Sequence, residues 1–301
     1  MSRRRDLALF VALSVAWGLS FPAIRAGLGS FPPFLFAALR FGAAGVLLFG
    51  YLLGTGTDRR PRTRADVAAI AAAAVFVVAF GNGLLFAGQR TVPSGVASIL
   101  YALIPILTAG LAAVLLPGEP ITPRRLGGVA LGFLGVGVIA RPDPSNLLAA
   151  ELFGIALVVA AAASVALGSV LLRRLGSTLE IEALTSWAML VGSVLLAVGS
   201  ALAGEGLTDV TLTPVGVAAV VYLAVFASAL AYAAYFALLD RVGPLEINLV
   251  SYAVPVVATA AGVALLGETL TAGTVAGFGL IAGGFVVLKG GAIVAELRGS
   301  G

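Results

Sequence analysis

Ten runs of apolar residues, each long enough to cross a lipid bilayer as an α-helix, divide this chain almost from end to end. A bilayer core of about 30 Å is crossed by about 20 apolar residues in helical conformation. The connections are short and rich in proline, glycine and charge, which leaves no room for a soluble domain. We therefore expect an all-α integral membrane protein with ten transmembrane helices. The runs cover residues 7–27, 33–54, 66–89, 93–116, 123–140, 151–172, 181–203, 214–239, 244–266 and 271–290.

The composition excludes most other classes of protein. Of the 301 residues, 60% are hydrophobic and 11% are charged, whereas a soluble domain has about 25% charged residues. Cysteine and histidine are both absent, which removes disulfides, thiol chemistry, histidine proton relays and the usual zinc sites. We expect no cofactor and no metal. The basic residues lie in short loops between apolar runs, so we expect no nucleic-acid partner.

The orientation follows from the distribution of arginine and lysine. Residues 1–5 and the apolar run after them are interpreted as the first span, because no small-residue cleavage site is followed by a polar chain. Cytoplasmic loops of membrane proteins carry an excess of basic residues. With both termini in the cytoplasm, the opposite loops contain only Arg90 and Arg141, with Arg25 near the same end of the first span. We expect a multi-pass protein of a prokaryotic plasma (inner) membrane with both termini cytoplasmic.

The two halves of the sequence are similar to each other, which indicates an internal duplication. The second half aligns with the first at an offset of 150 residues, which becomes 149 after Pro117. Because each half holds five spans, an odd number, the second copy enters the membrane with opposite polarity. We expect inverted five-helix repeats at residues 1–140 and 151–289, an architecture typical of alternating-access carriers with a substrate site near the bilayer midplane. The aligned pairs include Phe86 with Phe236, Val92 with Val242, Pro105 with Pro255, Gly118 with Gly267, Glu119 with Glu268 and Thr122 with Thr271.

A set of short motifs occurs in order along nearly the whole chain. They are Ala16-Trp17-Gly18 with Pro22, Ala38-Leu39-Arg40-Phe41, Pro105, the turn at 116–122 and its second copy at 266–271. In these motifs the chain resembles the EamA-type carriers of the drug/metabolite transporter superfamily. The resemblance implies the ten-helix fold and transport of amino acids or other small metabolites. Related branches move sugar phosphates, nucleotide sugars or drugs, so the resemblance leaves the substrate open.

Polar residues inside the spans indicate where a cavity lies, because polar groups facing lipid are costly. In the ninth span Asn248, Ser251 and Tyr252 share one helical face with Pro255. The fourth span repeats the stripe, so we expect both to line a shared interior, with Pro105 and Pro255 as hinges. The alternative is that the prolines only bend the helices for packing. The predicted substrate-binding residues are Ser14, Trp17, Phe21, Asn82, Ser98, Tyr101, Tyr232, Tyr235, Asn248, Ser251 and Tyr252.

Arg40 and the glycine motifs are assigned structural roles. Arg40 lies about 10 Å into the second span, where it either attracts a substrate carboxylate or phosphate or caps the carbonyls of a neighbouring helix. The structural role is favoured because the seventh span has no equivalent basic residue. Spans five and ten carry glycine at four-residue spacing, which predicts close packing between them. The glycines assigned to this contact are Gly128, Gly132, Gly277 and Gly283.

The expected function is an alternating-access carrier that exports or exchanges small metabolites, foremost amino acids or related compounds. All 14 acidic residues lie at span ends or in loops, which favours uncoupled exchange or downhill export, with a Na⁺ site of carbonyls and hydroxyls left open. A channel is one alternative. A lipid-acting intramembrane enzyme is another, but it needs paired buried carboxylates, histidine or a Ser–Lys pair, which the sequence lacks. The expected partners are a small molecule and the bilayer; a monomer suffices for transport and a dimer is left open.

Overall fold

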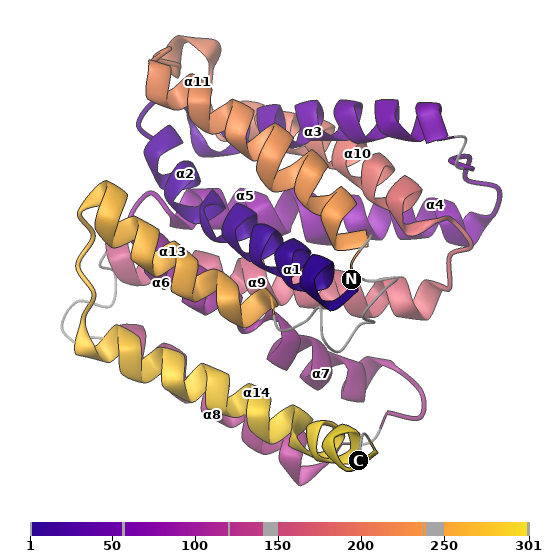
Figure 1. The fold of residues 1–301 in the computed structure, drawn as a ribbon. Helices are drawn as coiled ribbons and strands as arrows, with labels where there is room; N and C mark the ends of the chain where they lie inside the picture. The colour runs from indigo at the N-terminus through magenta and orange to yellow at the C-terminus, as the bar shows by residue number, and fades with distance from the viewer. Residues whose placement is uncertain are drawn as a thin grey trace.

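The computed structural model describes residues 2–55, 58–119, 121–140, 150–236, 238 and 250–299. The described regular structure is entirely helical, which confirms the predicted all-α class (Figure 1). Eight helices are long and apolar enough to cross a membrane, and two shorter apolar helices, Val250–Leu266 and Ala272–Leu288, follow them. The eight are Arg5–Gly27, Pro33–Thr55, Arg64–Gly88, Ser94–Leu115, Pro123–Ala140, Ala150–Leu175, Ile181–Leu202 and Pro214–Phe236. Each overlaps one of the first eight apolar runs.

Several of these spans are built from more than one helical segment. The first consists of α1 (Ser2–Gly18) and α2 (Ser20–Gly27), and the second of α3 (Pro33–Thr55). The third consists of α4 (Arg64–Ala72), the π-helix η1 (Ala73–Phe80) and α5 (Gly81–Gly88). The remaining segments are α6 (Ser94–Tyr101), α7 (Ile104–Leu115), α8 (Pro123–Ala140), α9 (Ala150–Leu175), α10 (Ile181–Leu202), α11 (Pro214–Val221), the π-helix η3 (Tyr222–Leu230), α13 (Val250–Leu266) and α14 (Ala272–Gly299).

The outer surface of the bundle is apolar. Val46 is 63% exposed, Val114 72% and Leu202 84%, and side chains of this kind are stable at a surface only where the surrounding medium is itself apolar. The interior is filled by large side chains such as Phe36 and Phe86, both fully buried. The described helices therefore have the surface of a protein embedded in lipid.

The bundle has two ends, which we name after two glutamates. At the Glu119 end α1 begins, α3 and α7 end, and both chain termini lie (Figure 1). At the Glu268 end α2 finishes, α3 and α6 begin, and α13 turns into α14 (Figure 1).

Several local features recur 149 or 150 residues apart. Thr63 and Thr213 each cap a helix, and their hydroxyls accept hydrogen bonds from the N–H groups of Asp66 and Gly216 at 3.1 and 3.0 Å. The π-helices Ala73–Phe80 and Tyr222–Leu230 occupy equivalent positions in the third and eighth spans. Gly118 and Gly267 both have positive φ, 82° and 65°, which glycine adopts without strain. The two halves of the chain therefore share local backbone structure as well as sequence.

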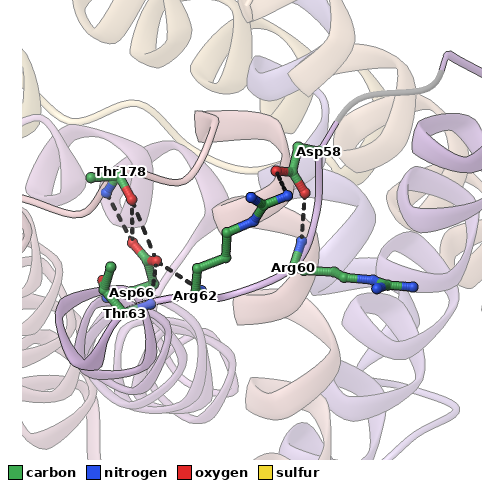
Figure 2. A network of polar contacts seen from close by, with 6 residues as sticks. All are labelled: Asp58, Arg60, Arg62, Thr63, Asp66 and Thr178. Atoms are coloured by element: carbon green, nitrogen blue, oxygen red, sulfur yellow. Dashed lines mark hydrogen bonds and ion pairs between the residues drawn. The ribbon is translucent and has the colours of Figure 1, made fainter.

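The two halves also contact each other reciprocally. At the start of the third span, Asp66 accepts a hydrogen bond from the Thr178 N–H at 2.9 Å (Figure 2). It also accepts one from the Ser177 hydroxyl at 2.8 Å, in the same connection after α9. At the start of the eighth span, the Thr213 hydroxyl lies 2.5 Å from the Ser30 hydroxyl, in the connection after α2. In each half, therefore, the start of the third membrane span is hydrogen-bonded to the connection between the first and second spans of the other half.

Helices α8 and α14 pack through glycine, as the spacing predicted, and of the four assigned glycines only Gly283 is outside the contact. A methyl group on Gly128 would lie 2.8 Å from the carbonyl oxygen of Gly284, and one on Gly135 would lie 2.7 Å from that of Gly277. A methyl group on Gly132 would lie 3.0 Å from the Leu103 side chain, but the Gly132 backbone nitrogen still borders α14, 3.3 Å from where a methyl group on Gly284 would be. A methyl group on Gly283 would meet nothing within 4 Å. The assignment of Gly283 to the contact was wrong, because residues seven apart share a helical face whereas Gly283 is rotated about 100° from Gly284.

Candidate functional site

The fourth span is interrupted beside its proline. Helix α6 ends at Tyr101, a turn covers Ala102 and Leu103, and α7 begins at Ile104. Pro105 has no N–H to donate to the carbonyl four residues earlier, so the helix is weakest at this point. In the ninth span, by contrast, α13 runs through Pro255 without a break. The hinge role of the two prolines stays a prediction, but equivalent segments have different conformations.

Aromatic side chains from the first, fourth and eighth spans meet inside the bundle. The Trp17 ring lies 5.7 Å from the Tyr232 ring and 5.5 Å from the Tyr235 ring, measured between centroids. Phe21, one turn after Trp17, lies edge-on to Tyr101 at 6.0 Å, and the Tyr101 hydroxyl donates to the Gly81 carbonyl at 3.0 Å. We call these five residues the aromatic cluster. Distances of 4.5–7 Å in tilted or edge-on geometry are favourable for aromatic pairs.

Arg40 of α3 is buried beside this cluster, with 7% of its surface exposed. Its Nε–H donates to the Ser228 hydroxyl of η3 at 3.2 Å. Its guanidinium carbon lies 4.7 Å from the centre of the Phe41 ring and 5.9 Å from that of Phe86. Ser228 precedes Tyr232 by four residues, about one helical turn, so this hydrogen bond holds the guanidinium near the Tyr232 side of the cluster. Among the described residues Arg40 donates to no helix carbonyl, so the capping role predicted for it is not seen within them.

Three predicted site residues use their polar groups within their own spans. Ser14 donates to the Phe10 carbonyl at 2.8 Å, and Ser98 donates to the Gly95 carbonyl at 2.7 Å. The Asn82 amide donates to the Val77 carbonyl at 3.0 Å, at the end of the π-helix. In this conformation these donors satisfy local backbone and do not face the aromatic cluster as free groups.

Of the described ninth-span residues, Tyr252 contacts a ring outside the aromatic cluster. The ring of Tyr252 packs on Phe285 of α14 at 4.4 Å, and its hydroxyl is buried without a hydrogen-bond partner. Tyr252 thus faces α14 in this conformation, and its assignment to the substrate wall stays a prediction. Ser251 is half-buried. Asn248 lies outside the described residues.

The turn before α14 supplies a cap for another helix. Helix α6 begins after Pro93 and has no capping side chain of its own. Glu268 takes this role, because its carboxylate accepts hydrogen bonds from the Ser94 N–H at 2.7 Å, the Ser94 hydroxyl at 2.8 Å and the Gly95 N–H at 3.2 Å. A carboxylate at a helix N-terminus is also favoured by the helix dipole. We call this contact the Glu268 latch.

Glu119, which aligns with Glu268 in the first half, has different partners. It forms ion pairs with Arg125 of α8 and, at 3.1 Å, with Arg173 of α9. Hydrogen bonds from Arg125 and then Arg173 hold the pKa of the Glu119 carboxyl below its usual value. Two equivalent turns therefore place their glutamates differently: one caps the start of the fourth span, and the other is held by arginines.

Two residues that the sequence reading did not single out belong to the same region. Ser228 is fully buried and is the hydrogen-bond partner of Arg40. Tyr222 donates its hydroxyl to the Ala16 carbonyl at 2.9 Å, one residue before Trp17. Both lie on η3, where the π-helical turn changes which residues face inwards. A polar serine in an apolar span was a visible signal for Ser228.

In the part of the chain that the structure describes, no group of three or more acidic side chains is arranged to hold a metal ion. Together these features define an integral membrane helical bundle with an aromatic centre and a buried cation. The chain belongs to the EamA-like transporter family, which matches residues 5–141 and again residues 152–289. The resemblance found in the sequence motifs is thus confirmed, and the protein is a membrane transporter.

Several relatives match nearly the full length of the chain. The uncharacterized inner membrane transporter YedA of Escherichia coli (strain K12) is 35% identical over 269 residues, covering 88% of this chain and 83% of the relative. An uncharacterized transporter of Archaeoglobus fulgidus is 32% identical over 283 residues, covering 93% and 97%. A probable amino-acid metabolite efflux pump of Salmonella typhimurium is 29% identical over 295 residues, covering 94% of each chain. A solved crystal structure with 23% identity shares the fold with a TM-score of 0.64, covering 95% of this chain and 98% of that one.

Proposed function

We propose that the protein is an alternating-access carrier made of two inverted five-helix repeats, and that it moves small amphipathic metabolites outward. The two family matches, the recurring caps and π-helices, and the reciprocal contacts of Asp66 and Thr213 support the repeats. The relative named as a probable amino-acid metabolite efflux pump supports amino acids or related compounds as cargo and export as the direction. The aromatic cluster is the proposed substrate wall, because rings with a few polar groups suit an amphipathic ligand.

The observation that carries this proposal is the difference between the two equivalent turns. Glu268 bridges to the start of α6, whereas Glu119 is held by Arg125 and Arg173. The break in the fourth span has no counterpart in α13 either. If two repeats related by a two-fold axis adopt different conformations, exchanging these conformations closes one end of the bundle and opens the other. The asymmetry therefore supplies the two states that alternating access needs.

We assign this conformation to the state in which the Glu268 end is closed. At this end Gly95 of α6 lies so close to α13 that a methyl group on it would be 2.9 Å from the Thr259 hydroxyl. With both termini in the cytoplasm, the Glu268 end faces outward. In the opposite state the Glu268 latch releases, and Glu119 leaves its arginines for the start of the ninth span. No buried carboxylate is needed for this exchange, so we propose uncoupled exchange or downhill export.

Cross-linking across the Glu268 end tests the proposal. The chain has no native cysteine, so Val96→Cys and Val263→Cys introduce a unique pair that lines one small cavity between α6 and α13. Joining this pair with a short, reducible bifunctional thiol reagent should stop exchange of labelled amino acids in liposomes, and reduction should restore it. Each single-cysteine variant treated in the same way is the control and should keep its flux.

The same liposomes separate a carrier from a channel. A carrier shows saturable flux that unlabelled substrate on the far side accelerates, and a channel shows neither property. Undiminished flux through the cross-linked pair, or flux without saturation and trans-stimulation, would contradict alternating access.

A further inference from the structure

We propose that Arg40 binds the carboxylate of the substrate, and that the aromatic cluster receives monocarboxylates with an apolar, ring-bearing body. This inference rests on the proposed carrier function and names the chemistry of its cargo. It takes up the role that the sequence left as the less favoured alternative for Arg40, because the guanidinium donates to Ser228 and lies against the Phe41 and Phe86 rings.

Most of the donors of Arg40 have no protein partner. A guanidinium carries five N–H groups in a planar fork. Within the described ranges, the Nε–H group donates to Ser228, and Arg40 makes no other hydrogen bond and no ion pair. The rings of Phe41 and Phe86 contact the guanidinium through their π-systems and accept no strong hydrogen bond from it. The two terminal nitrogens are therefore free to bind a ligand.

A purely structural role does not explain a charge in this position. Burying an ion without a counter-ion costs several kcal/mol, and the three ion pairs formed by described residues all lie at the Glu119 end of the bundle. A methionine or leucine would fill the same space against Phe41 and Phe86 without that cost. A carboxylate that arrives with the substrate offsets the cost and matches the fork with two parallel hydrogen bonds.

The charge count favours a monoanion. Arg25, one turn after Phe21, keeps its charge but is held at the end of the first span by hydrogen bonds to the carbonyls of Gln89 and Arg90 at 2.6 and 2.5 Å. Arg40 is thus the cation that remains available beside the cluster among the described residues. A phosphate dianion would leave one negative charge unpaired in a medium of low polarity. No described acidic side chain faces the cluster, so a substrate ammonium group finds no counter-ion and is dispensable.

The neighbouring rings define the rest of the ligand. Tyr232 connects the two parts of the site, since it follows Ser228, the hydrogen-bond partner of Arg40, by about one helical turn, and its ring lies 5.7 Å from the Trp17 ring. The Trp17 indole N–H and the hydroxyls of Tyr232 and Tyr235 make no hydrogen bond within the described chain. An apolar body therefore packs on rings while these polar groups orient a second substituent.

Trp17 itself reports binding. The chain has two tryptophans, and the other, Trp187, lies near the Glu119 end with its indole donating to the Arg59 carbonyl. In the Trp187→Phe variant, quenching of Trp17 fluorescence by 3-phenylpropionate is compared with quenching by its neutral amide, 3-phenylpropanamide. We expect the acid to bind at least about tenfold more tightly than the amide, the minimum for hydrogen bonds to a charged group.

For each Arg40 variant we compare the affinity for the acid with the affinity for the amide, measured on the same protein sample. A lower fraction of folded protein affects both values equally and therefore leaves their ratio unchanged. Arg40→Gln should lower the ratio to about 1, and Arg40→Lys, which keeps the charge without the fork, should give an intermediate ratio. Arg173→Gln, which removes an arginine at the Glu119 end, is the matched control and should keep the wild-type ratio. Phenylalanine should bind no more tightly than 3-phenylpropionate, and phenyl phosphate should bind more weakly.

The inference is overturned if acid and amide bind equally to the wild-type site, if no probe quenches Trp17, if Arg40→Gln keeps the ratio, or if phenyl phosphate binds best. If saturable, trans-stimulated flux is observed but substitution of Arg40 leaves the acid-to-amide affinity ratio unchanged, the carrier function is supported and the proposed role of Arg40 is refuted. If Arg40→Gln lowers the acid-to-amide affinity ratio but cross-linking of Val96→Cys and Val263→Cys leaves flux unchanged, the binding site is supported and alternating access is refuted.

Discussion

The carboxylate of Glu268 lies 2.7 Å from the backbone nitrogen of Ser94, although 174 residues separate them in the chain. This contact fastens the turn before α14 to the N-terminus of α6, a helix with no capping side chain of its own. A charge-assisted bond of this kind is strong enough to set the balance between two conformations and weak enough to break during a transport cycle.

Weakening this bond should open the Glu268 end. In Glu268→Gln the N-terminus of α6 loses its negative partner, so we expect the closed state to be less populated. A cysteine placed at Thr259, which faces Gly95 in the closed state, should react about tenfold faster with a membrane-impermeant thiol reagent added from the Glu268 side. Glu205→Gln is the matched control, because Glu205 caps α3 through the Leu35 N–H at 2.9 Å and not α6. Equal reaction rates in the parent and Glu268→Gln proteins would rule out the latch.

The tyrosines Tyr101 and Tyr252 should respond in opposite ways to loss of the hydroxyl. Tyr101→Phe removes a hydrogen bond of 3.0 Å to Gly81 and should lower the free energy of unfolding by about 1 kcal/mol. Tyr252→Phe removes a buried hydroxyl that has no partner, and should leave stability unchanged or raise it by about 1 kcal/mol. Thermal unfolding of the purified variants measures both. The reverse order of stability would contradict the described hydrogen bonding.

Glycines of α8 and α14 should differ sharply in their tolerance of bulk. Gly135→Leu forces a side chain against the backbone of Gly277 and should cost about 1–3 kcal/mol or separate the two helices. Gly283→Leu enters open space and should leave the thermal midpoint nearly unchanged. Both variants should keep the substrate preference of the parent, because the contact lies away from the aromatic cluster. A destabilised Gly283→Leu protein would show that the packing face is wrongly placed.

The pH dependence of stability should reflect Glu119. Because its pKa is lowered in the folded protein, the stabilisation it provides is complete above the unfolded pKa, about 4.3, and is lost as pH falls through the lower, folded value. The difference in thermal midpoint between the parent and Glu119→Gln should therefore be constant from about pH 5.5 to 8 and shrink below about pH 4. Flux over pH 5.5 to 8 should stay flat once substrate ionisation is allowed for. A difference that grows on acidification would contradict the ion pairs.

The sequence alone determined the features that depend on local composition and spacing. Run length and hydropathy predicted the helices, because helical rise and bilayer thickness fix how many apolar residues a span needs. The offset of 149–150 residues predicted which turns would be alike, and Gly118 and Gly267 do adopt similar φ angles. The aromatic contacts of Trp17, Tyr232 and Tyr235 also followed from the rule that amphipathic side chains deep in a span avoid lipid.

Only the tertiary structure decided how each helix is rotated and which distant group it meets. The π-helices and the break before Pro105 change the direction in which later residues point, and no periodicity in the sequence announces such changes. The way whole helices are rotated and packed likewise decides that Tyr252 meets Phe285, that Gly284 and not Gly283 faces α8, and that Arg40 donates a hydrogen bond to Ser228. Glu119 and Glu268 stand in equivalent turns yet have different partners, because the local sequence fixes the shape of a turn whereas the packing of the whole bundle fixes what lies opposite it.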